Sequence, residues 1–197
     1  RWGRIAETTG EDPLLNCDMS AAHVRGYHRG GIHSCVKHYA AYGGAEAGRD
    51  YNTVDMSERT LREYYLPSYK AAVDAGTDMV MTSFNSLNGV PSAGNKRLVD
   101  GILRKEWGFD GLVMTDWFGL DDRVKSAEAG LDLEMPGTDG KSTAYMVEQW
   151  KQGRLDEHVI RERAECIIRN ARKWKIPKTK KTEEERELIL KENHEKV

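Results

Sequence analysis

Short apolar runs that each end in polar residues recur along this sequence, with stretches of helical periodicity between them. The runs lie at residues 32–39, 77–85, 112–114 and 130–135, and they have the length and composition of buried parallel strands. The segments between them are long enough to carry the crossover helices of βαβ units. The expected fold class is therefore α/β, with parallel strands alternating with helices.

The intervening segments show apolar residues at helical spacing and recognisable helix ends. The expected helices are residues 16–29, 57–75, 95–107, 142–152 and 156–174. The side chains expected to face the core on the first and last of them are Met19, Ala22 and Val24, then Ile160, Ala164, Ile167, Ile168 and Ala171. Asn88 and Gly89 are expected to form a turn.

The run at residues 112–114 stops abruptly at Thr115, Asp116 and Trp117. Reacting groups in parallel α/β proteins sit at the carboxyl ends of strands, and packing explains a carboxylate beside a large aromatic ring poorly. The structural alternative is that Asp116 caps a following helix or accepts hydrogen bonds from loop amides. Asp116 is thus the first candidate for a functional group.

Polar residues also follow the other apolar runs, as a (β/α) barrel requires when several strands build one site. They are Lys37 and His38, Asn85 beside the apolar Phe84, and Glu134. Taken singly, a histidine at such a position is more often a hydrogen-bonded structural residue. Arg4 beside Trp2 is likewise compatible with a plain surface charge. The strands are too few to close an eight-stranded barrel, so we expect part of one.

Composition excludes several classes of partner. A net charge of −2 gives no reason to expect nucleic acid or an anionic membrane, and no apolar run approaches the ~20 residues that cross a bilayer. The cysteines Cys17, Cys35 and Cys166 are widely spaced and lack a CxxC pattern, so neither a disulfide framework nor a metal site is expected. Free thiols favour a reducing compartment such as the cytoplasm. The chain begins at Arg1, so its first residues carry no information about a signal peptide.

Five ordered motifs resemble glycoside hydrolase family 3. They read RWGRIAETTGEDP, VKHYAAYGG, AGRDYNTVDMSERTLREYYLPSYKAAVDAG, VMTSFNSLNGVPSAGNKRLVDGILRKEWGFDGLVMTDWFG and AGLDLEMPG. The resemblance covers about residues 1–175 and implies the central to C-terminal part of the family's N-terminal TIM-type (β/α)8 barrel. It implies a β-glucosidase-like enzyme that releases sugars from the non-reducing end with retention of configuration. No metal or organic cofactor is implied, because two carboxyl groups suffice for this chemistry.

The resemblance implies that Asp116, the aspartate of the TDW motif, is the catalytic nucleophile. It also implies a set of side chains that bind the sugar in the subsite being cleaved: Arg4, Lys37, His38, Arg49, Phe84 and Trp117. Physical chemistry agrees, since nearby cations keep a carboxylate ionised and hold hydroxyls by charge-assisted bonds. A flat indole offers an apolar face to a sugar ring. Family members often carry Tyr where this chain has Phe84, so a phenol that could bond the nucleophile is absent.

The resemblance further implies that some of the machinery lies outside these residues. The acid/base glutamate of the glucosidase branch usually comes from a following α/β domain, and no glutamate here matches it. Residues 176–197 are expected to be a charged linker towards that domain. The expected partner is a β-glucoside or another small β-glycoside, with the rest of the barrel and the following domain needed as well.

Two alternatives come from other classes. The chain could be an inactive fragment or subunit that acts only in assembly or weak sugar binding, because an open parallel sheet leaves unpaired edges. A barrel enzyme of the aldolase type that uses Lys37 as a Schiff-base amine is chemically possible too.

Overall fold

A three-stranded parallel sheet forms the centre of the structure, a computed structural model that describes residues 2–174, 182, 187–188, 191 and 194. Its strands are β1 (Cys35–Tyr39), β2 (Met79–Thr82) and β5 (Leu112–Met114), with β2 in the middle. Val80 of β2 pairs with Val36 on one side and with Val113 on the other. The parallel register brings the carboxyl ends of all three strands to one edge of the sheet. The α/β class predicted from the sequence is confirmed.

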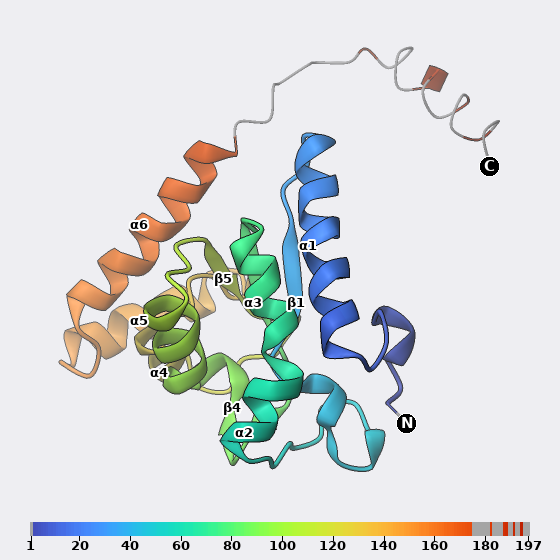
Figure 1. The fold of residues 1–197 in the computed structure, drawn as a ribbon. Helices are drawn as coiled ribbons and strands as arrows, with labels where there is room; N and C mark the ends of the chain where they lie inside the picture. Colours follow the sequence, from blue (N-terminus) through green and yellow to red (C-terminus); the bar gives the residue numbers. More distant parts are fainter. Residues whose placement is uncertain (1, 175–181, 183–186, 189–190, 192–193, 195–197) are drawn as a thin grey trace.

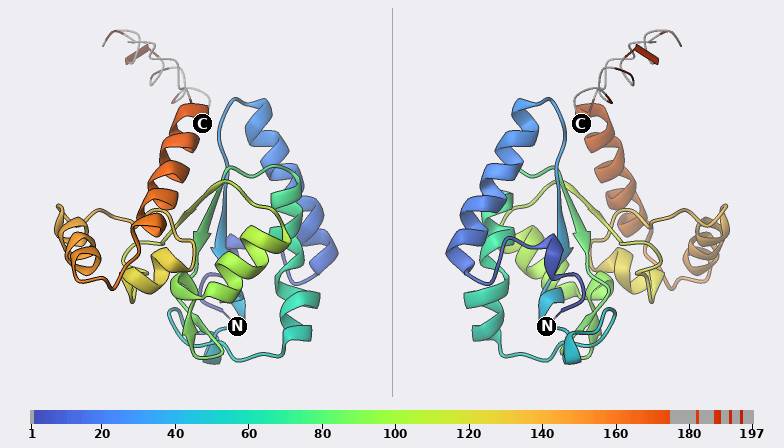
Figure 2. Two further views of the ribbon diagram at one scale, coloured as in Figure 1. Left: turned by 90° about the vertical axis from the view of Figure 1, so that its left-hand side faces the viewer. Right: turned by 90° about the vertical axis from the view of Figure 1, so that its right-hand side faces the viewer.

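Helices flank this sheet on both sides. Figure 2 shows the strands between α1 (Pro13–Arg29) and α3 (Pro67–Asp74) on one side and α6 (Glu157–Lys173) on the other. Figure 1 shows α1 and α6 at opposite flanks of the molecule. The remaining helical elements are η1 (Ile5–Glu7), η2 (Tyr42–Gly44), η3 (Glu46–Gly48), α2 (Glu58–Thr60), η4 (Leu61–Tyr65), η5 (Ser92–Gly94), η6 (Arg97–Glu106), α4 (Arg123–Glu128) and α5 (Lys141–Lys151).

The first helix, α1, begins three residues earlier than its apolar spacing predicts. Asp12 caps it by accepting a hydrogen bond from the Leu15 N–H at 2.7 Å, and Pro13 occupies the first position, where its missing N–H costs nothing. Of the side chains predicted to face the core, Val24 is buried, whereas Met19 and Ala22 are exposed. That part of the prediction is wrong, because α1 contacts the rest of the chain mainly through α3 along one narrow face.

The single helix predicted for residues 57–75 is divided in the structure. Ser57 caps its start by accepting a hydrogen bond from the Thr60 N–H. The π-helix η4 follows α2, and a separate α-helix, α3, begins at Pro67. Proline cannot donate to the preceding turn, so the helical ladder is interrupted there. Leu61 and Ala72 of this segment are buried.

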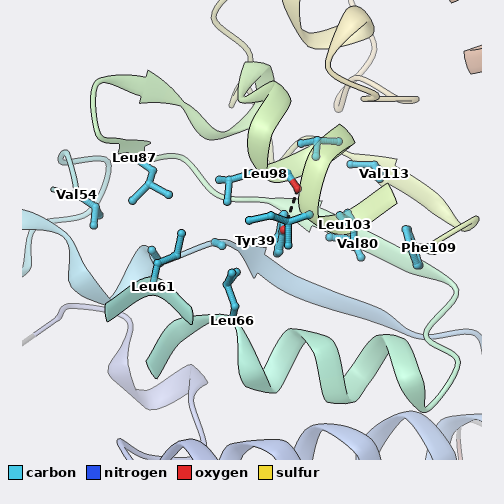
Figure 3. Packing of buried hydrophobic residues seen from close by; sticks show 14 of the residues in the cluster. Tyr39, Val54, Leu61, Leu66, Val80, Leu87, Leu98, Leu103, Phe109 and Val113 are labelled. Atoms are coloured by element: carbon cyan, nitrogen blue, oxygen red, sulfur yellow. Dashed lines mark hydrogen bonds between the residues drawn. The ribbon is translucent and has the colours of Figure 1, made fainter. Parts of the chain in front are cut away.

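The main core lies between the sheet and the helices that cross over it. Figure 3 shows Leu98 and Leu103 of η6 packed beside Tyr39 of β1, with Val80 and Val113 of the neighbouring strands close by. The hydroxyl of Tyr39 donates to the carbonyl of Leu98 at 2.9 Å, which satisfies a polar group in an otherwise apolar cluster. β1 and η6 are therefore joined at the level of the core.

Two short strands form a hairpin next to the core. β3 (Ser86–Leu87) and β4 (Val90–Pro91) pair in antiparallel fashion around Asn88 and Gly89. Both turn residues have positive φ, 50° and 81°, which asparagine and glycine tolerate. The turn predicted from these two residues is confirmed.

The strand predicted for residues 130–135 is not formed as such. Leu133 makes one isolated bridge to Met114, and the backbone N–H of Val113 donates at 2.8 Å to the side chain of Asp132. A buried carboxylate thus takes the place of a backbone partner, which is why the ladder does not extend. The preceding segment contains the helix α4, which is capped by Asp122.

The last helix, α6, buries a different face from the predicted one. Cys166 and Asn170 are buried, whereas Ala164, Ile168 and Ala171 are exposed. The buried face is chosen by polar contacts: the Cys166 thiol reaches the Gly111 carbonyl at 3.5 Å, beside β5. The predicted linker at residues 176–197 lies outside the described residues, apart from the isolated positions 182, 187–188, 191 and 194.

Candidate active site

The turn after β5 holds Asp116 in a fixed place. Thr115 is fully buried; its N–H donates to the Leu133 carbonyl at 3.0 Å, and its hydroxyl accepts from the Met135 N–H at 2.8 Å. Asp116 follows directly, with only 13% of its side chain exposed, and its Oδ1 accepts a hydrogen bond from the Trp117 N–H at 2.7 Å. Its Oδ2 points to groups on other parts of the chain. The structural alternative, in which Asp116 accepts hydrogen bonds from loop amides, thus accounts for Oδ1 but not for Oδ2.

A histidine from β1 and an arginine from the N-terminal segment meet Asp116. His38 Nε2 lies 3.1 Å from Asp116 Oδ2, and an Arg4 terminal nitrogen lies 3.8 Å from the same oxygen. A second Arg4 nitrogen lies 3.1 Å from His38 Nε2. The N-terminal segment reaches the carboxyl ends of the strands (Figure 2), so residues far apart in sequence form one cluster. The structure thus brings together Arg4, His38 and Asp116, three of the residues that the family resemblance names.

Burial keeps the His38 ring neutral. The side chain is 3% exposed, and burial, reinforced by the positive charges of Arg4 and Lys37, lowers the pKa of His38 from 6.5 to about 4 despite the opposing charges of Asp116 and Glu7. Tyr69 fixes the backbone at this point by donating its hydroxyl to the His38 carbonyl at 2.5 Å. In the neutral ring, Nε2 either donates to Asp116 Oδ2 or accepts from Arg4, according to the tautomer.

This pKa predicts a loss of stability in mild acid. His38 has a lower pKa in the folded than in the unfolded chain, so its contribution is complete above pH 6.5 and disappears as the pH falls to about 4. The shift corresponds to about 3 kcal/mol of unfolding free energy. Urea unfolding across this pH range is expected to show a markedly smaller pH dependence in His38→Gln than in the unsubstituted chain. The exposed His158 serves as the control, since His158→Gln is expected to keep the original dependence. If the free energy of unfolding depended on pH in the same way in His38→Gln and in the unsubstituted chain, the prediction would be contradicted.

Lys37 is connected to the cluster by Glu7, a residue that was not identified from the sequence. Its Nζ lies 3.9 Å from Glu7 Oε2, and Glu7 in turn accepts hydrogen bonds from Arg4 Nε and a terminal nitrogen at 2.8 and 3.0 Å. Arg4, the residue before η1, and Glu7, its last residue, are three positions apart, and this spacing is the signal that could have identified Glu7. Glu7 therefore links two predicted sugar-binding cations.

Aromatic rings line one side of the cluster. The ring of Tyr42 stands edge-on to His38 at 5.5 Å, and Phe84 lies 6.0 Å from Tyr42. Phe84 also lies against the turn after Asp116, because a Cβ on Gly119 would come within 3.3 Å of its ring. Phe84 is thus near the cluster through packing. Tyr42 was not singled out from the sequence.

Among the described residues, two predicted site residues have side chains that make no hydrogen bond, ion pair or ring contact with the cluster. Arg49 is exposed, and within the described part of the chain its side chain makes no hydrogen bond or ion pair. Trp117 is 49% exposed, although its backbone N–H holds Asp116. Their roles remain predictions. A separate hollow lined by Thr77, Asp78, Trp107 and Gly111 lies at the amino ends of the strands, opposite to Asp116.

Among the described residues no group of three or more His, Cys, Asp or Glu side chains is placed to hold a metal ion. None of the helices described in the structure has the length and apolar character that crossing a membrane requires.

A parallel α/β arrangement whose charged residues converge at the carboxyl ends of neighbouring strands is the layout of a (β/α) barrel. Residues 1–170 match the family model of the glycosyl hydrolase family 3 N-terminal domain, and the chain belongs to this family. The prediction of part of a TIM-type barrel is confirmed.

The relatives and solved structures most similar in sequence or shape include several β-glucosidases. A β-glucosidase of Rhizobium radiobacter is 40% identical over 167 residues, covering 84% of this chain and 20% of that protein. Thermostable β-glucosidase B of Acetivibrio thermocellus is 38% identical, covering 85% and 22%. The crystal structure of β-glucosidase from Listeria innocua in complex with glucose superimposes with a TM-score of 0.83 at 36% identity, covering 94% of this chain and 30% of that one. The chain therefore spans about a fifth of the length of these curated relatives.

Proposed function

We propose that this chain contributes the nucleophile and part of the sugar-binding pocket to a retaining, β-glucosidase-like glycoside hydrolase. The observation that carries the proposal is the carboxylate of Asp116, set at the end of β5 with His38 at 3.1 Å and Arg4 at 3.8 Å. The similarity to β-glucosidases supports the same reaction class, and the Listeria innocua complexes with glucose support glucose as the sugar.

In this proposal Asp116 Oδ2 attacks the anomeric carbon of the sugar as the bond to the leaving oxygen breaks. A glycosyl ester of Asp116 forms, and a second carboxyl group protonates the leaving oxygen. The same group then removes a proton from water, which hydrolyses the ester and regenerates the carboxylate. We propose that a segment outside these residues supplies that second carboxyl group. No organic cofactor or metal is needed for either step.

The proposed binding roles follow from the chemistry of the side chains. Arg4, Lys37 and Arg49 would donate charge-assisted hydrogen bonds to sugar hydroxyls. The neutral His38 would donate from Nε2 either to Asp116 or to a sugar hydroxyl that takes the place of Asp116 as the acceptor. Phe84 and Trp117 would supply apolar faces to the ring. The proposed domain division, a barrel part at residues 1–175 followed by a linker, agrees with the extent of the family match.

The experiment is covalent labelling with a 2-deoxy-2-fluoro β-glucoside that carries a good leaving group, followed by peptide mass spectrometry. This reagent needs the nucleophile but little help from an acid. Labelling of the peptide that bears Asp116 is the expected result, in the chain alone or after flanking segments are restored. Labelling only after restoration would mean that the pocket needs those segments. Absence of labelling in both forms would overturn the proposal for glucosides.

A further inference from the structure

Glu7 contacts Arg4, which lies 3.8 Å from Asp116, and also Lys37, the residue before His38, yet nothing in the proposed reaction gives Glu7 a task. Its two carboxylate oxygens accept from Arg4 at 2.8 and 3.0 Å, which is the paired geometry that suits a guanidinium best. Lys37 Nζ lies 3.9 Å from the second oxygen. One carboxylate therefore stands between the two positive groups.

The distances show that Arg4 interacts more closely with Glu7 than with Asp116. It makes two hydrogen bonds to Glu7 but stays 3.8 Å from Asp116, beyond hydrogen-bond range. A free arginine side chain has many rotamers and moves readily to the nearest anion. Without Glu7, the carboxylates left to attract Arg4 are Asp116, at 3.8 Å, and Asp50, whose charge also acts on the guanidinium.

A guanidinium bonded directly to Asp116 would weaken it as a nucleophile, because it would draw charge from the attacking oxygen. It would also remove Arg4 from the hydroxyls it is proposed to bind. We propose that Glu7 is a positioning residue, which holds Arg4 and Lys37 over the sugar site and keeps Arg4 from closing on Asp116. This inference rests on the proposed function.

A direct acid role for Glu7 does not fit its surroundings. The hydrogen bonds from Arg4 lower the pKa of Glu7 below its ordinary value, so the group is an anion at neutral pH. An ionised carboxylate cannot protonate a leaving oxygen. Glu7 therefore acts on the reaction through the two cations that it holds.

The test uses the complete enzyme with Glu7→Gln, Glu7→Asp and the control Glu11→Gln, an exposed residue of the same loop. Glu7→Gln is expected to raise KM for an aryl β-glucoside roughly tenfold, since charge-assisted bonds to the sugar are lost. The acidic limb of the kcat/KM profile, which reports the ionised base of the free enzyme, is expected to move about one pH unit lower. A residue that served folding alone would not move this limb.

Glu7→Asp keeps the carboxylate and is expected to restore much of the original pH profile, while Glu11→Gln is expected to match the unsubstituted enzyme. A Glu7→Gln enzyme with unchanged KM and an unchanged acidic limb would overturn the inference. The labelling experiment separates this failure from that of the proposed function. If the unsubstituted enzyme is labelled on Asp116 and Glu7→Gln behaves normally, only the positioning role is lost.

Discussion

Replacing Asp116 with asparagine is expected to lower kcat/KM for a β-glucoside by at least about 10⁴-fold, because loss of an attacking group removes the covalent route. The amide keeps the shape of the side chain but cannot form the glycosyl ester. The measurement is steady-state hydrolysis of an aryl β-glucoside by the complete enzyme. The expected fall is far larger than that from removal of any single sugar contact.

Two further variants make this result specific. Asp121→Asn changes an exposed aspartate five residues along the same segment and is expected to leave hydrolysis unchanged. Asp116→Ala leaves room for azide, which is expected to attack from the vacated side and yield the α-glucosyl azide from an activated β-glucoside. Full activity in Asp116→Asn, or an azide product of β configuration, would contradict the nucleophile role.

Replacing Asp132 with alanine is expected to lower the free energy of unfolding by about 3–5 kcal/mol, the cost of breaking a buried ion pair on one side. The Asp132 side chain is fully buried, and it accepts from Arg104 at 2.5 Å and from Arg163 at 3.0 Å. It also accepts the Val113 N–H of β5 at 2.8 Å. Removal of the carboxylate leaves two largely buried cations and one strand amide without their partner.

Urea unfolding measures this effect, and Asp110→Ala provides the matched control. Asp110 is 74% exposed and its ion pair with Lys173, at 3.5 Å, is of the kind worth at most about 1 kcal/mol. The loss expected for Asp132→Ala is a large part of the ~5–15 kcal/mol that holds a typical domain. Equal unfolding midpoints for the two variants would show that the Asp132 network does not stabilise the fold.

The local sequence predicted the elements whose signals are complete within a few residues. Asn88 and Gly89 form their turn, because the backbone preferences of these two residues act locally. The strand before Asp116 was found for the same reason: a short apolar run with a polar end has few other solutions. The family motifs then identified the residues around Asp116, of which the structure brings Arg4 and His38 into contact with it.

Local sequence signals were misleading where a side chain replaces a backbone hydrogen-bond partner, or where a polar side chain takes a core position. The segment around Asp132 has the composition of a strand, but its buried carboxylate takes the Val113 N–H that a strand would have paired. On α6 the apolar residue Ile168 is exposed while the polar Asn170 is buried. Apolar spacing alone could not show this, because the choice of face depends on partners far away in the sequence.

The sequence by itself determined the α/β class, the alternation of its elements and the place of Asp116 at a strand end, since these follow from periodicity and local turn chemistry. Only the tertiary structure decided which charges meet there. The contacts of Asp116 with His38 and Arg4, and the position of Glu7 between Arg4 and Lys37, join β5, β1 and the N-terminal segment. Such distances depend on how the elements pack, and sequence spacing carries no measure of them.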